Sequence, residues 1–598
     1  MKTAPDKPRS QDSVRETFES IVVAFVLAFL FRTFIAEAFV IPTGSMAPTL
    51  FGRHKDVQCP QCGYDYEVSA SHELDQDGNM LLRRITRGAC PNCRFATNIK
   101  DLPVFKGDRI LVNKFPYELG EPQRWDVCVF KYPEIPERNY IKRLIGLPGE
   151  AIRLSRGDVY AQRGEDPRYH ILRKDDPNKQ AAIQILVFDD RHPPRKLLEQ
   201  GWPERWAAMQ PGGGPAAIAG WTDHPEGCAA DAENRTYKLS TDETAWLRYR
   251  HFVPTQVDWE GLAEGLPPNP HPRPQLITDF YGYNTDDQHG GETDDLFWVG
   301  DLTVSGVVRV EAPKSDDAAI VLELVEGVRR YRCTILLKTG QATLSRNDDL
   351  NPEGADIELG KAATPVRGSG EYRFQFANVD DRLCLWINRA LIPFGDDADT
   401  AGVVPAAVIP DPQNADLTPV GLAVRQATAT FSELVLKRDI YYRAERVAND
   451  DRGQLDRLND GEGMHEIMGR QLYEKLGDPT EYAELYDQKA SRPVDFARLA
   501  EDEFFVMGDN SPQSQDSRLW PNSRGAVNRH AVPRNAMVGK AFLIYWPHGI
   551  PFLNDGAGYP VLWHKVPRNQ IGQPIAENYP AYTAPFYPQF GRWLKRIR

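Results

Sequence analysis

The stretch Ile41-Pro42-Thr43-Gly44-Ser45-Met46-Ala47-Pro48-Thr49-Leu50 decides the fold and the function that we expect for this sequence. It follows closely on a long apolar run that begins at Ile21. A hydroxyl flanked by glycine and proline is common in tight turns, so Ser45 taken alone could be a solvated turn residue. Ser45 could instead be a nucleophile, and in that case a base and supporting groups must follow later in the chain.

Length and composition predict a multidomain globular protein rich in β-structure. A chain of 598 residues is too long for one hydrophobic core, so several domains are expected. The 47 prolines and 46 glycines indicate many turns and strands and few long helices. The formal net charge of −13 argues against a nucleic-acid-binding protein, which would need a basic face.

Residues 18–41 are predicted to form a single transmembrane anchor, because about 20 mostly apolar residues suffice to cross a bilayer. Arg32 and Glu37 interrupt the apolar run, and Arg32 could place its charge at the interface. Basic residues within 1–17 favour a cytoplasmic N-terminus. A cleavable signal peptide ending near Ala38 is the alternative. In both cases we expect the rest of the chain on the extracytoplasmic side, and an uncleaved anchor would hold it at the inner membrane.

Four of the eight cysteines form two Cys-x-x-Cys pairs, and we interpret the segment 54–100 as a zinc-ribbon-like insert. Four thiolates in two such turns can surround a zinc ion as a tetrahedron with no open position, so the zinc would be structural. One or two disulfides are the alternative, because an extracytoplasmic compartment is oxidising. The candidate ligands are Cys59, Cys62, Cys90 and Cys93.

A candidate base occurs in the stretch Tyr140-Ile141-Lys142-Arg143-Leu144-Ile145, which is typical of a strand. A lysine among apolar neighbours usually snorkels or pairs with an acid. Burial there also lowers the pKa of a lysine from about 10.4 toward neutrality. A neutral amine at Lys142 could then take the proton from a serine hydroxyl, as in Ser–Lys nucleophilic catalysis.

Four segments in this order resemble bacterial type I signal peptidase, the membrane-bound Ser–Lys leader peptidase. They are 39–50, 107–114, 140–150 and 505–518, and together they belong to roughly a third of the chain. The resemblance implies an antiparallel β catalytic domain built from 42–53, 101–179 and 501–550. It also implies removal of signal peptides from exported preproteins through an acyl-enzyme, without a cofactor for catalysis.

The resemblance assigns roles to individual residues of this sequence. Ser45 would be the nucleophile and Lys142 the general base. Thr43 would add its hydroxyl to the oxyanion hole, and Ser514 would orient the Lys142 amine. Residues that would hold the surrounding loop are Asp509, Asp516 and Arg518, and residues that would shape the substrate pockets are Ile41, Met46, Tyr140 and Ile141.

The sequence departs from the family's pattern at Ser511-Pro512, where the family often has Arg-Asp after its Gly-Asp-Asn motif. This departure concerns the salt bridges of the loop and leaves the predicted Ser–Lys dyad intact.

The segment 180–445 interrupts the catalytic pattern, and its short strands between turns predict an inserted β-sandwich. It resembles a laminin-G or concanavalin-like jelly roll. We expect it to act as a scaffold, and it could also dock glycans or proteins. Residues 446–500 are predicted to be a helical connector. In the tail 551–598, the basic end 591–598 could either lie on anionic lipid or be solvated.

The expected partners are therefore preproteins that carry signal peptides, together with membrane lipid, and no nucleic acid. A self-cleaving Ser–Lys protease of the SOS-repressor type would lack the anchor and carry a DNA-binding module. A membrane-anchored glycan- or protein-binding protein with a relic protease fold is the other alternative. The presence of Ser45, Lys142 and Ser514 argues against this last interpretation.

Overall fold

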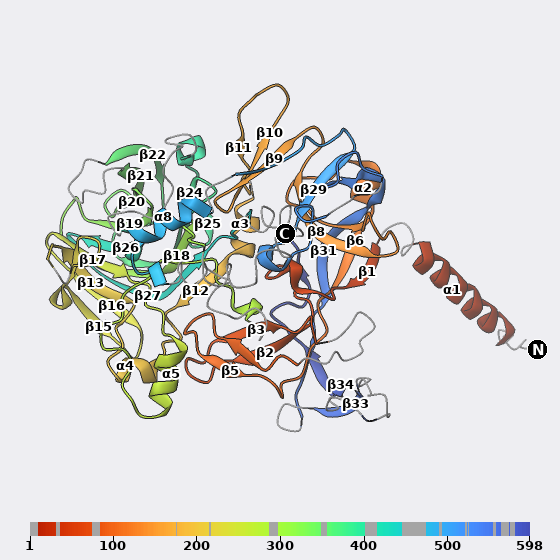
Figure 1. The fold of residues 1–598 in the computed structure, drawn as a ribbon, viewed down its shortest axis with the longest axis horizontal. Helices are drawn as coiled ribbons and strands as arrows, with labels where there is room; N and C mark the ends of the chain where they lie inside the picture. The colour runs from red at the N-terminus through yellow and green to blue at the C-terminus, as the bar shows by residue number, and fades with distance from the viewer. Residues whose placement is uncertain are drawn as a thin grey trace, which may run out of the picture.

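The structure is a computed structural model in which three β-rich parts follow an N-terminal helix (Figure 1). The inserted sandwich and the catalytic sheet lie at opposite sides of the view, and the cysteine-rich hairpins lie below and between them. The prediction of a mainly β protein is confirmed. The structure describes residues 10–30, 36–73, 84–174, 176–214, 217–285, 297–347, 356–400, 415–444, 474–489, 493–520, 523, 525–553, 558–563, 573 and 580–598.

The catalytic part is an antiparallel sheet in which strands distant in sequence are neighbours. Apolar residues of its central strands face a core that contains Ile110, Val129 and Ile544. A second, smaller sheet consists of four strands in the order β11, β10, β9 and β28. The main sheet has the order β1 (Ala36–Val40), β6 (Arg109–Asn113), β31 (Met537–Trp546), β7 (Val127–Lys131), β8 (Asn139–Gly146), β29 (Glu503–Met507) and β30 (Val532–Pro533), and the smaller one consists of β9 (Ala151–Ser155), β10 (Asp158–Gln162), β11 (His170–Ile171) and β28 (Val494–Phe496).

The N-terminal segment differs from the predicted anchor over 18–41. Helix α1 (Ser10–Leu30) projects away from the rest of the protein, and residues 31–35, with Arg32, lie outside the described part. Ala36–Val40 is strand β1 and pairs with β6, so the end of the predicted span belongs to the catalytic sheet. The Glu37 carboxylate, which interrupted the apolar run, is paired with Lys114 just after β6. No helix among the described residues is long and apolar enough to cross a membrane.

The cysteine-rich insert consists of two short hairpins with a Cys-x-x-Cys turn in each. The first hairpin joins β2 (His54–Gln58) to β3 (Asp65–Ser69), and the second joins β4 (Arg87–Ala89) to β5 (Ala96–Asn98). Residues 74–83 of this insert lie outside the described part. The two hairpins bury their sulfurs in one small core with Trp202 and Trp259 of the sandwich insert.

The inserted sandwich has two antiparallel sheets of eight strands each, which enclose the largest core of the protein. Residues on both inner faces are apolar, as in Val304 and Phe431 of one sheet and Leu322 and Leu422 of the other. One sheet contains β12 (Ile185–Asp189), β15 (Cys228–Asp231), β16 (Thr236–Ser240), β18 (Leu302–Pro313), β23 (Gly370–Val379), β24 (Arg382–Ile387), β25 (Ala390–Leu391) and β27 (Ala427–Arg438); the other contains β13 (Trp206–Pro211), β14 (Trp221–Asp223), β17 (Thr244–Tyr249), β19 (Ala319–Glu326), β20 (Arg329–Leu336), β21 (Gln341–Asn347), β22 (Ile357–Ala363) and β26 (Val420–Arg425).

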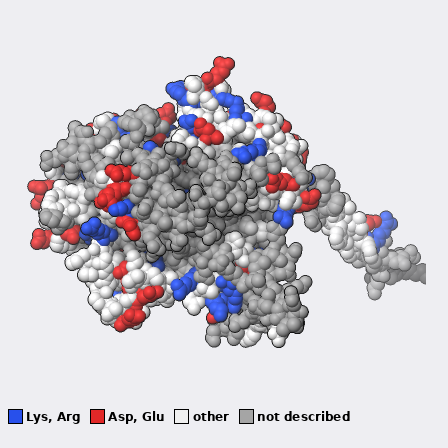
Figure 2. Space-filling model, viewed as in Figure 1, with Lys and Arg blue, Asp and Glu red and all other residues white. Residues whose placement is uncertain are grey.

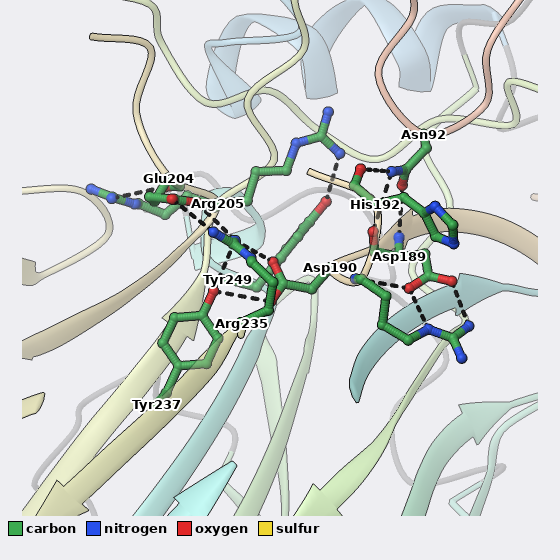
Figure 3. A network of polar contacts seen from close by, with 11 residues as sticks. Asn92, Asp189, Asp190, His192, Glu204, Arg205, Arg235, Tyr237 and Tyr249 are labelled. Atoms are coloured by element: carbon green, nitrogen blue, oxygen red, sulfur yellow. Dashed lines mark hydrogen bonds and ion pairs between the residues drawn. The ribbon is translucent and has the colours of Figure 1, made fainter. Parts of the chain in front are cut away.

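Polar contacts join the second cysteine turn to the sandwich (Figure 3). The Asn92 side chain donates to the carbonyl oxygens of Asp189 and His192 and accepts from the Asp189 amide at 2.7 Å. The next residue, Asp190, receives hydrogen bonds from Arg235 and Tyr237 within the sandwich. Since Asn92 is buried, its three hydrogen bonds fix the cysteine-rich hairpins against the first sandwich strand.

The short helices lie between the strands. The predicted connector 446–500 contains helix α8 (Pro479–Lys489), and its residues 446–473 lie outside the described part. Its end differs from the prediction, because Val494–Phe496 is strand β28 and pairs with β9. The other α-helices among the described residues are α2 (Phe115–Leu119), α3 (Pro177–Ile183), α4 (Arg195–Glu199) and α5 (Gln256–Ala263).

The basic C-terminal end, 591–598, is docked onto the catalytic part through two buried residues. Arg592 is buried and forms an ion pair with Asp108, and Ile597 belongs to the core of the catalytic sheet. A buried apolar side chain and a paired guanidinium account for this docking better than a surface charge patch would. The strands of this segment are β32 (Gly549–Pro551), β33 (Tyr559–Trp563), β34 (Pro580–Ala584), β35 (Phe586–Pro588) and β36 (Lys595–Arg596), of which β36 pairs with β31.

Acidic and basic side chains of the described residues are interspersed on the face of the protein seen in Figure 2, without a large area of one sign.

Candidate active site

The Ser45 hydroxyl and the Lys142 amine meet beside strand β8 of the catalytic sheet. Ser45 lies in a single turn of 3-10 helix, Gly44–Met46, directly after β1, and Lys142 lies on β8. The Lys142 Nζ is hydrogen-bonded to the Ser45 Oγ at 2.7 Å and also donates to the Ile141 carbonyl at 3.1 Å. Both side chains are buried, with exposed fractions of 7% for Ser45 and 4% for Lys142. This geometry is that of a nucleophile and its base.

The surroundings of Lys142 favour the neutral amine. Burial lowers its pKa to about 8, although the negative charge of Asp516 acts in the opposite direction. The guanidinium of Arg518 opposes Asp516 and helps to lower the pKa of the amine. A large fraction of Lys142 is therefore unprotonated at mildly alkaline pH and can accept the proton of Ser45.

Ser514 lies close to Ser45 without contacting the lysine amine through a hydrogen bond. Its hydroxyl is fully buried and lowers the pKa of the Asp516 carboxylate. Within the described part of the chain, no hydrogen bond joins Ser514 to Lys142. The predicted orientation of the amine by Ser514 therefore stays a prediction.

A cavity of about 1030 Å³ opens beside the dyad. Both Ser45 and Lys142 line it, and so does the exposed Thr43, two residues before the nucleophile. Of the predicted pocket residues, Ile41, Tyr140 and Ile141 line the cavity.

The position of Met46 differs from the one predicted, which was in a substrate pocket. It is fully buried in the core of the catalytic sheet and is not among the residues that line the cavity. The 3-10 turn causes this, because it directs the side chain after Ser45 into the core with Leu50 and Val112.

Asp509 and Asp516 hold two different guanidinium groups. Asp509 accepts two hydrogen bonds from Arg143, each of 2.6 Å, and also contacts Thr49. Such a bidentate pair fixes the loop firmly against β8. Sequence reasoning missed Arg143 and Thr49, although Arg143 stands next to the predicted base.

Asp516 pairs with Arg518 at 2.8 Å and accepts from the Gly508 amide at 2.9 Å. Burial would raise the pKa of Asp516, but the Arg518 charge outweighs this effect and lowers it. Arg518 also donates to the hydroxyl and the carbonyl of Ser511. Ser511, the first residue of the Ser-Pro departure, thus gives the arginine neutral acceptors.

Residues of both inserts contact the turn that carries Ser45. Asn284 of the sandwich insert exchanges two hydrogen bonds of 2.8 Å with Asn510, and Asn510 donates to the Gly44 carbonyl at 3.0 Å. Ser71, after the first cysteine hairpin, accepts from the Gly44 amide at 3.2 Å. Tyr283 packs against Gly44 so closely that a Cβ there would lie 2.4 Å from its ring. No local sequence signal identifies these contacts, because each partner is distant in the chain.

The four predicted zinc ligands converge. The Sγ atoms of Cys59 and Cys93 are 3.5 Å apart, those of Cys62 and Cys90 are 3.6 Å apart, and all four lie within 4.8 Å of one another. Tetrahedral zinc with Zn–S bonds of about 2.3 Å requires sulfurs about 3.8 Å apart. A disulfide would need about 2.0 Å, and the cysteines are free thiols. The donor set therefore fits zinc.

The two cysteine turns have the same hydrogen-bond pattern, which explains their geometry. The Gly63 amide donates to the Cys59 carbonyl, and the Arg94 amide donates to the Cys90 carbonyl. Gly63 and Arg94 both have positive φ, of 71° and 63°, at the corresponding position. Each pair of sulfurs is thereby presented from a tight turn, as in a zinc knuckle.

The sequence matches the family model described as "Signal peptidase, peptidase S26" over residues 100–193 and 448–546. These segments contain Lys142, Asp509 and Ser514. These segments form a part of the chain that is similar to peptidase S26, and we call this part the S26 domain. The predicted resemblance to type I signal peptidase is confirmed, and the matched segments contain strands β6, β7, β8, β29 and β31 of the catalytic sheet.

Curated relatives of the S26 domain are called signal peptidase I. The protein of Pseudomonas fluorescens is 30% identical over 192 residues, which cover 30% of this chain and 48% of the relative. For Pseudomonas aeruginosa the identity is 28%, covering 27% of this chain and 45% of the relative; for Rickettsia akari it is 29%, covering 32% and 67%. This chain thus spans about half the length of the two Pseudomonas relatives.

Solved structures similar to part of the chain include the carbohydrate-binding module CBM66 from Bacillus subtilis and sheep galectin-11. The first covers 35% of this chain and 90% of the module, with a TM-score of 0.21 and 12% identity. The second covers 23% of this chain and 90% of the galectin, with a TM-score of 0.16 and 14% identity. Likeness at this level carries no argument about ligands of the sandwich.

Proposed function

We propose that this protein is a serine endopeptidase of the signal peptidase type, which removes signal peptides from exported preproteins. The observation that carries the proposal is the hydrogen bond of 2.7 Å between the buried Lys142 amine and the Ser45 hydroxyl, beside a cavity that can take a peptide. The S26 domain supports the same activity.

In the proposed reaction, neutral Lys142 takes the proton of Ser45 as the serine oxygen attacks the scissile carbonyl. The developing oxyanion would be stabilised by the Ser45 amide and the Thr43 hydroxyl. Lys142 then gives its proton to the departing amine, which leaves the signal peptide as an ester on Ser45. Water, deprotonated by Lys142, hydrolyses this ester and restores the hydroxyl.

We also propose that the segment around α1 holds the S26 domain at the extracytoplasmic face of the inner membrane. The apolar side chains of Phe18, Val22 and Phe25 on α1 are more than half exposed, which favours contact with lipid. Placement at the membrane would bring Ser45 to the depth at which a preprotein presents its cleavage site. Docking of glycans or proteins to the sandwich stays a prediction.

We further propose that the four cysteines hold a structural zinc ion, which takes no part in the reaction. Bound zinc would supply charge and fixed geometry to Cys59, Cys62, Cys90 and Cys93. The turn that contains Ser71 would thereby be kept in contact with Gly44.

The test is cleavage of a preprotein in detergent by the wild type, Ser45→Ala, Lys142→Ala and a matched lysine control, Lys131→Ala. Lys131 is exposed and lies on β7 beside β8. We expect the first two variants to lose activity and Lys131→Ala to retain it. Equal cleavage by all four proteins would overturn the proposal.

A further inference from the structure

The cavity beside the dyad has a lining of one charge sign. Apart from the Lys142 amine of the dyad, the basic residues that line it are Arg53, Lys106, Arg109 and Arg138, and no aspartate or glutamate is among the described residues of the lining. The whole chain, by contrast, has a formal net charge of −13. A basic lining in an acidic protein is a local feature that the composition does not explain.

Lys106 and Arg109 stand close to each other without a compensating acid. The pKa of Lys106 is lowered by burial and then by the positive charges of Arg109 and Arg53. No carboxylate within the described part of the chain forms an ion pair with Lys106 or Arg109. Like charges held together in this way cost free energy, and an anionic ligand would recover it.

Asp108, the acid nearest in sequence, does not neutralise the charges of Lys106 and Arg109. Its carboxylate is buried, accepts from the Phe51 amide at 2.8 Å and pairs with Arg592 from the C-terminal segment. Lys106 and Arg109 therefore face the cavity, whereas the carboxylate of Asp108 between them faces the core.

A further basic residue comes from a different element. Arg138 lies in the exposed loop between β7 and β8, and its charge acts on the Tyr140 hydroxyl, which lines the cavity. Positive charge therefore reaches the cavity both from the start of β6 and from the loop that precedes the lysine strand.

We propose that this cavity selects preproteins that carry acidic side chains next to the scissile bond. This inference rests on the proposed function. Carboxylates of a bound peptide would form charge-assisted hydrogen bonds with Lys106 and Arg109, while lysine or arginine at the same positions would be repelled. A peptide is favoured over a lipid headgroup because these side chains share one cavity with Ser45 and Lys142.

The experiment uses the full chain in detergent and peptides that differ only at residues flanking the scissile bond, which are Asp and Glu, Asn and Gln, or Lys. We measure kcat/KM for the wild type, Lys106→Gln, Arg109→Gln and the control Arg389→Gln, an exposed arginine of the sandwich. The wild type should prefer the acidic peptide, and each cavity variant should reduce the ratio of acidic to neutral kcat/KM by about two- to fivefold. Arg389→Gln should leave the ratio unchanged.

A charge-reversal variant distinguishes the loss of a specific contact from misfolding of the protein. Lys106→Glu should shift the preference toward the lysine peptide, a gain that damage to the fold cannot produce. Raising the ionic strength should shrink the wild-type preference, because partly exposed charges are screened.

The failures of the two proposals can be told apart. If the wild type cleaves no peptide, the proposed function fails. If it cleaves all three peptides equally, or if Lys106→Gln and Arg109→Gln keep the wild-type ratio, the inference about acidic substrates is overturned. A variant that combines Lys106→Gln and Arg109→Gln is also tested for binding to phosphatidylglycerol vesicles. Weaker binding than the wild type, together with an unchanged peptide ratio, would assign the cluster to lipid and would also overturn the inference.

Discussion

At the scale of single residues, the chemistry depends on how Lys142 is kept neutral. Burial lowers its pKa, and the nearby carboxylates of Asp516 and Asp509 act in the opposite direction. Each of these acids is paired with an arginine, Arg518 or Arg143. The pairing limits the effect of the carboxylates on the amine, so that acids can hold the loop without fully protonating the base.

The pH dependence of cleavage follows from this pKa. Lys142 must lose its proton to act as a base, and its pKa of about 8 lies below the ordinary value of 10.5. We expect kcat/KM to rise about tenfold per pH unit below pH 8 and to level off above it. A profile whose midpoint lies near pH 10.5 would contradict a buried, neutral base.

Gly508 permits the close approach of the nucleophile turn to the loop that carries Ser514. A Cβ at this position would lie 2.3 Å from the Ser514 Oγ and 2.4 Å from the Ser45 carbonyl oxygen. Gly508→Ala should therefore displace Ser45 and lower both kcat and the free energy of unfolding, the latter by about 1–3 kcal/mol.

Gly213→Ala is the matched control, because a Cβ there meets no atom within 4 Å. Activity and denaturant unfolding of both variants are measured together. Wild-type kcat in Gly508→Ala would show that the approach of the two loops does not matter for catalysis.

At the scale of elements, the sequence predicted the strand that carries Lys142 but not which distant segments pair with the strands of the catalytic sheet. The motif around Lys142 and the Cys-x-x-Cys turns are local patterns, and local patterns predict local structure. Ala36–Val40 forms a strand by pairing with Arg109–Asn113, and Arg592 is held in place by its ion pair with the distant Asp108. Long-range pairing of this kind leaves no periodic signal in the sequence.

Metal content tests the cysteine-rich hairpins. We expect about one zinc ion per chain in the purified protein, and Cys59→Ser should lose it because three thiolates hold zinc less tightly than four. Cleavage should also weaken, since Ser71 after this hairpin contacts the nucleophile turn. Cys228→Ser, at a half-buried cysteine of the sandwich, is the control. Unchanged zinc in Cys59→Ser would rule out the four-cysteine site.

At the scale of the whole molecule, the inserts support the active site. The sandwich contributes Tyr283 and Asn284, and the cysteine-rich insert contributes Ser71, all in contact with the turn of Ser45 or its partner Asn510. Sequence reasoning predicted the sandwich as a scaffold but could not connect it to catalysis, because these contacts join residues hundreds of positions apart. The predicted interruption of the catalytic domain is thus part of its framework.

Asn284→Ala measures this coupling. The variant removes one of the two acceptors of the buried Asn510 side-chain amide, and the other acceptor, the Gly44 carbonyl, is then held less firmly, so we expect kcat to fall by about tenfold with little change in KM. Asn234→Ala, in an exposed turn of the sandwich, is the control. An unchanged kcat in Asn284→Ala would mean that the sandwich does not position the nucleophile.

The central claim is that Ser45 forms an ester with the signal peptide. Mass spectrometry of protein quenched during turnover above pH 8 tests this claim directly. The account predicts an added mass equal to the signal-peptide acyl group on the fragment that contains Ser45, and no such adduct in Lys142→Ala. An adduct on another residue, or cleavage by Ser45→Ala at the wild-type rate, would contradict it.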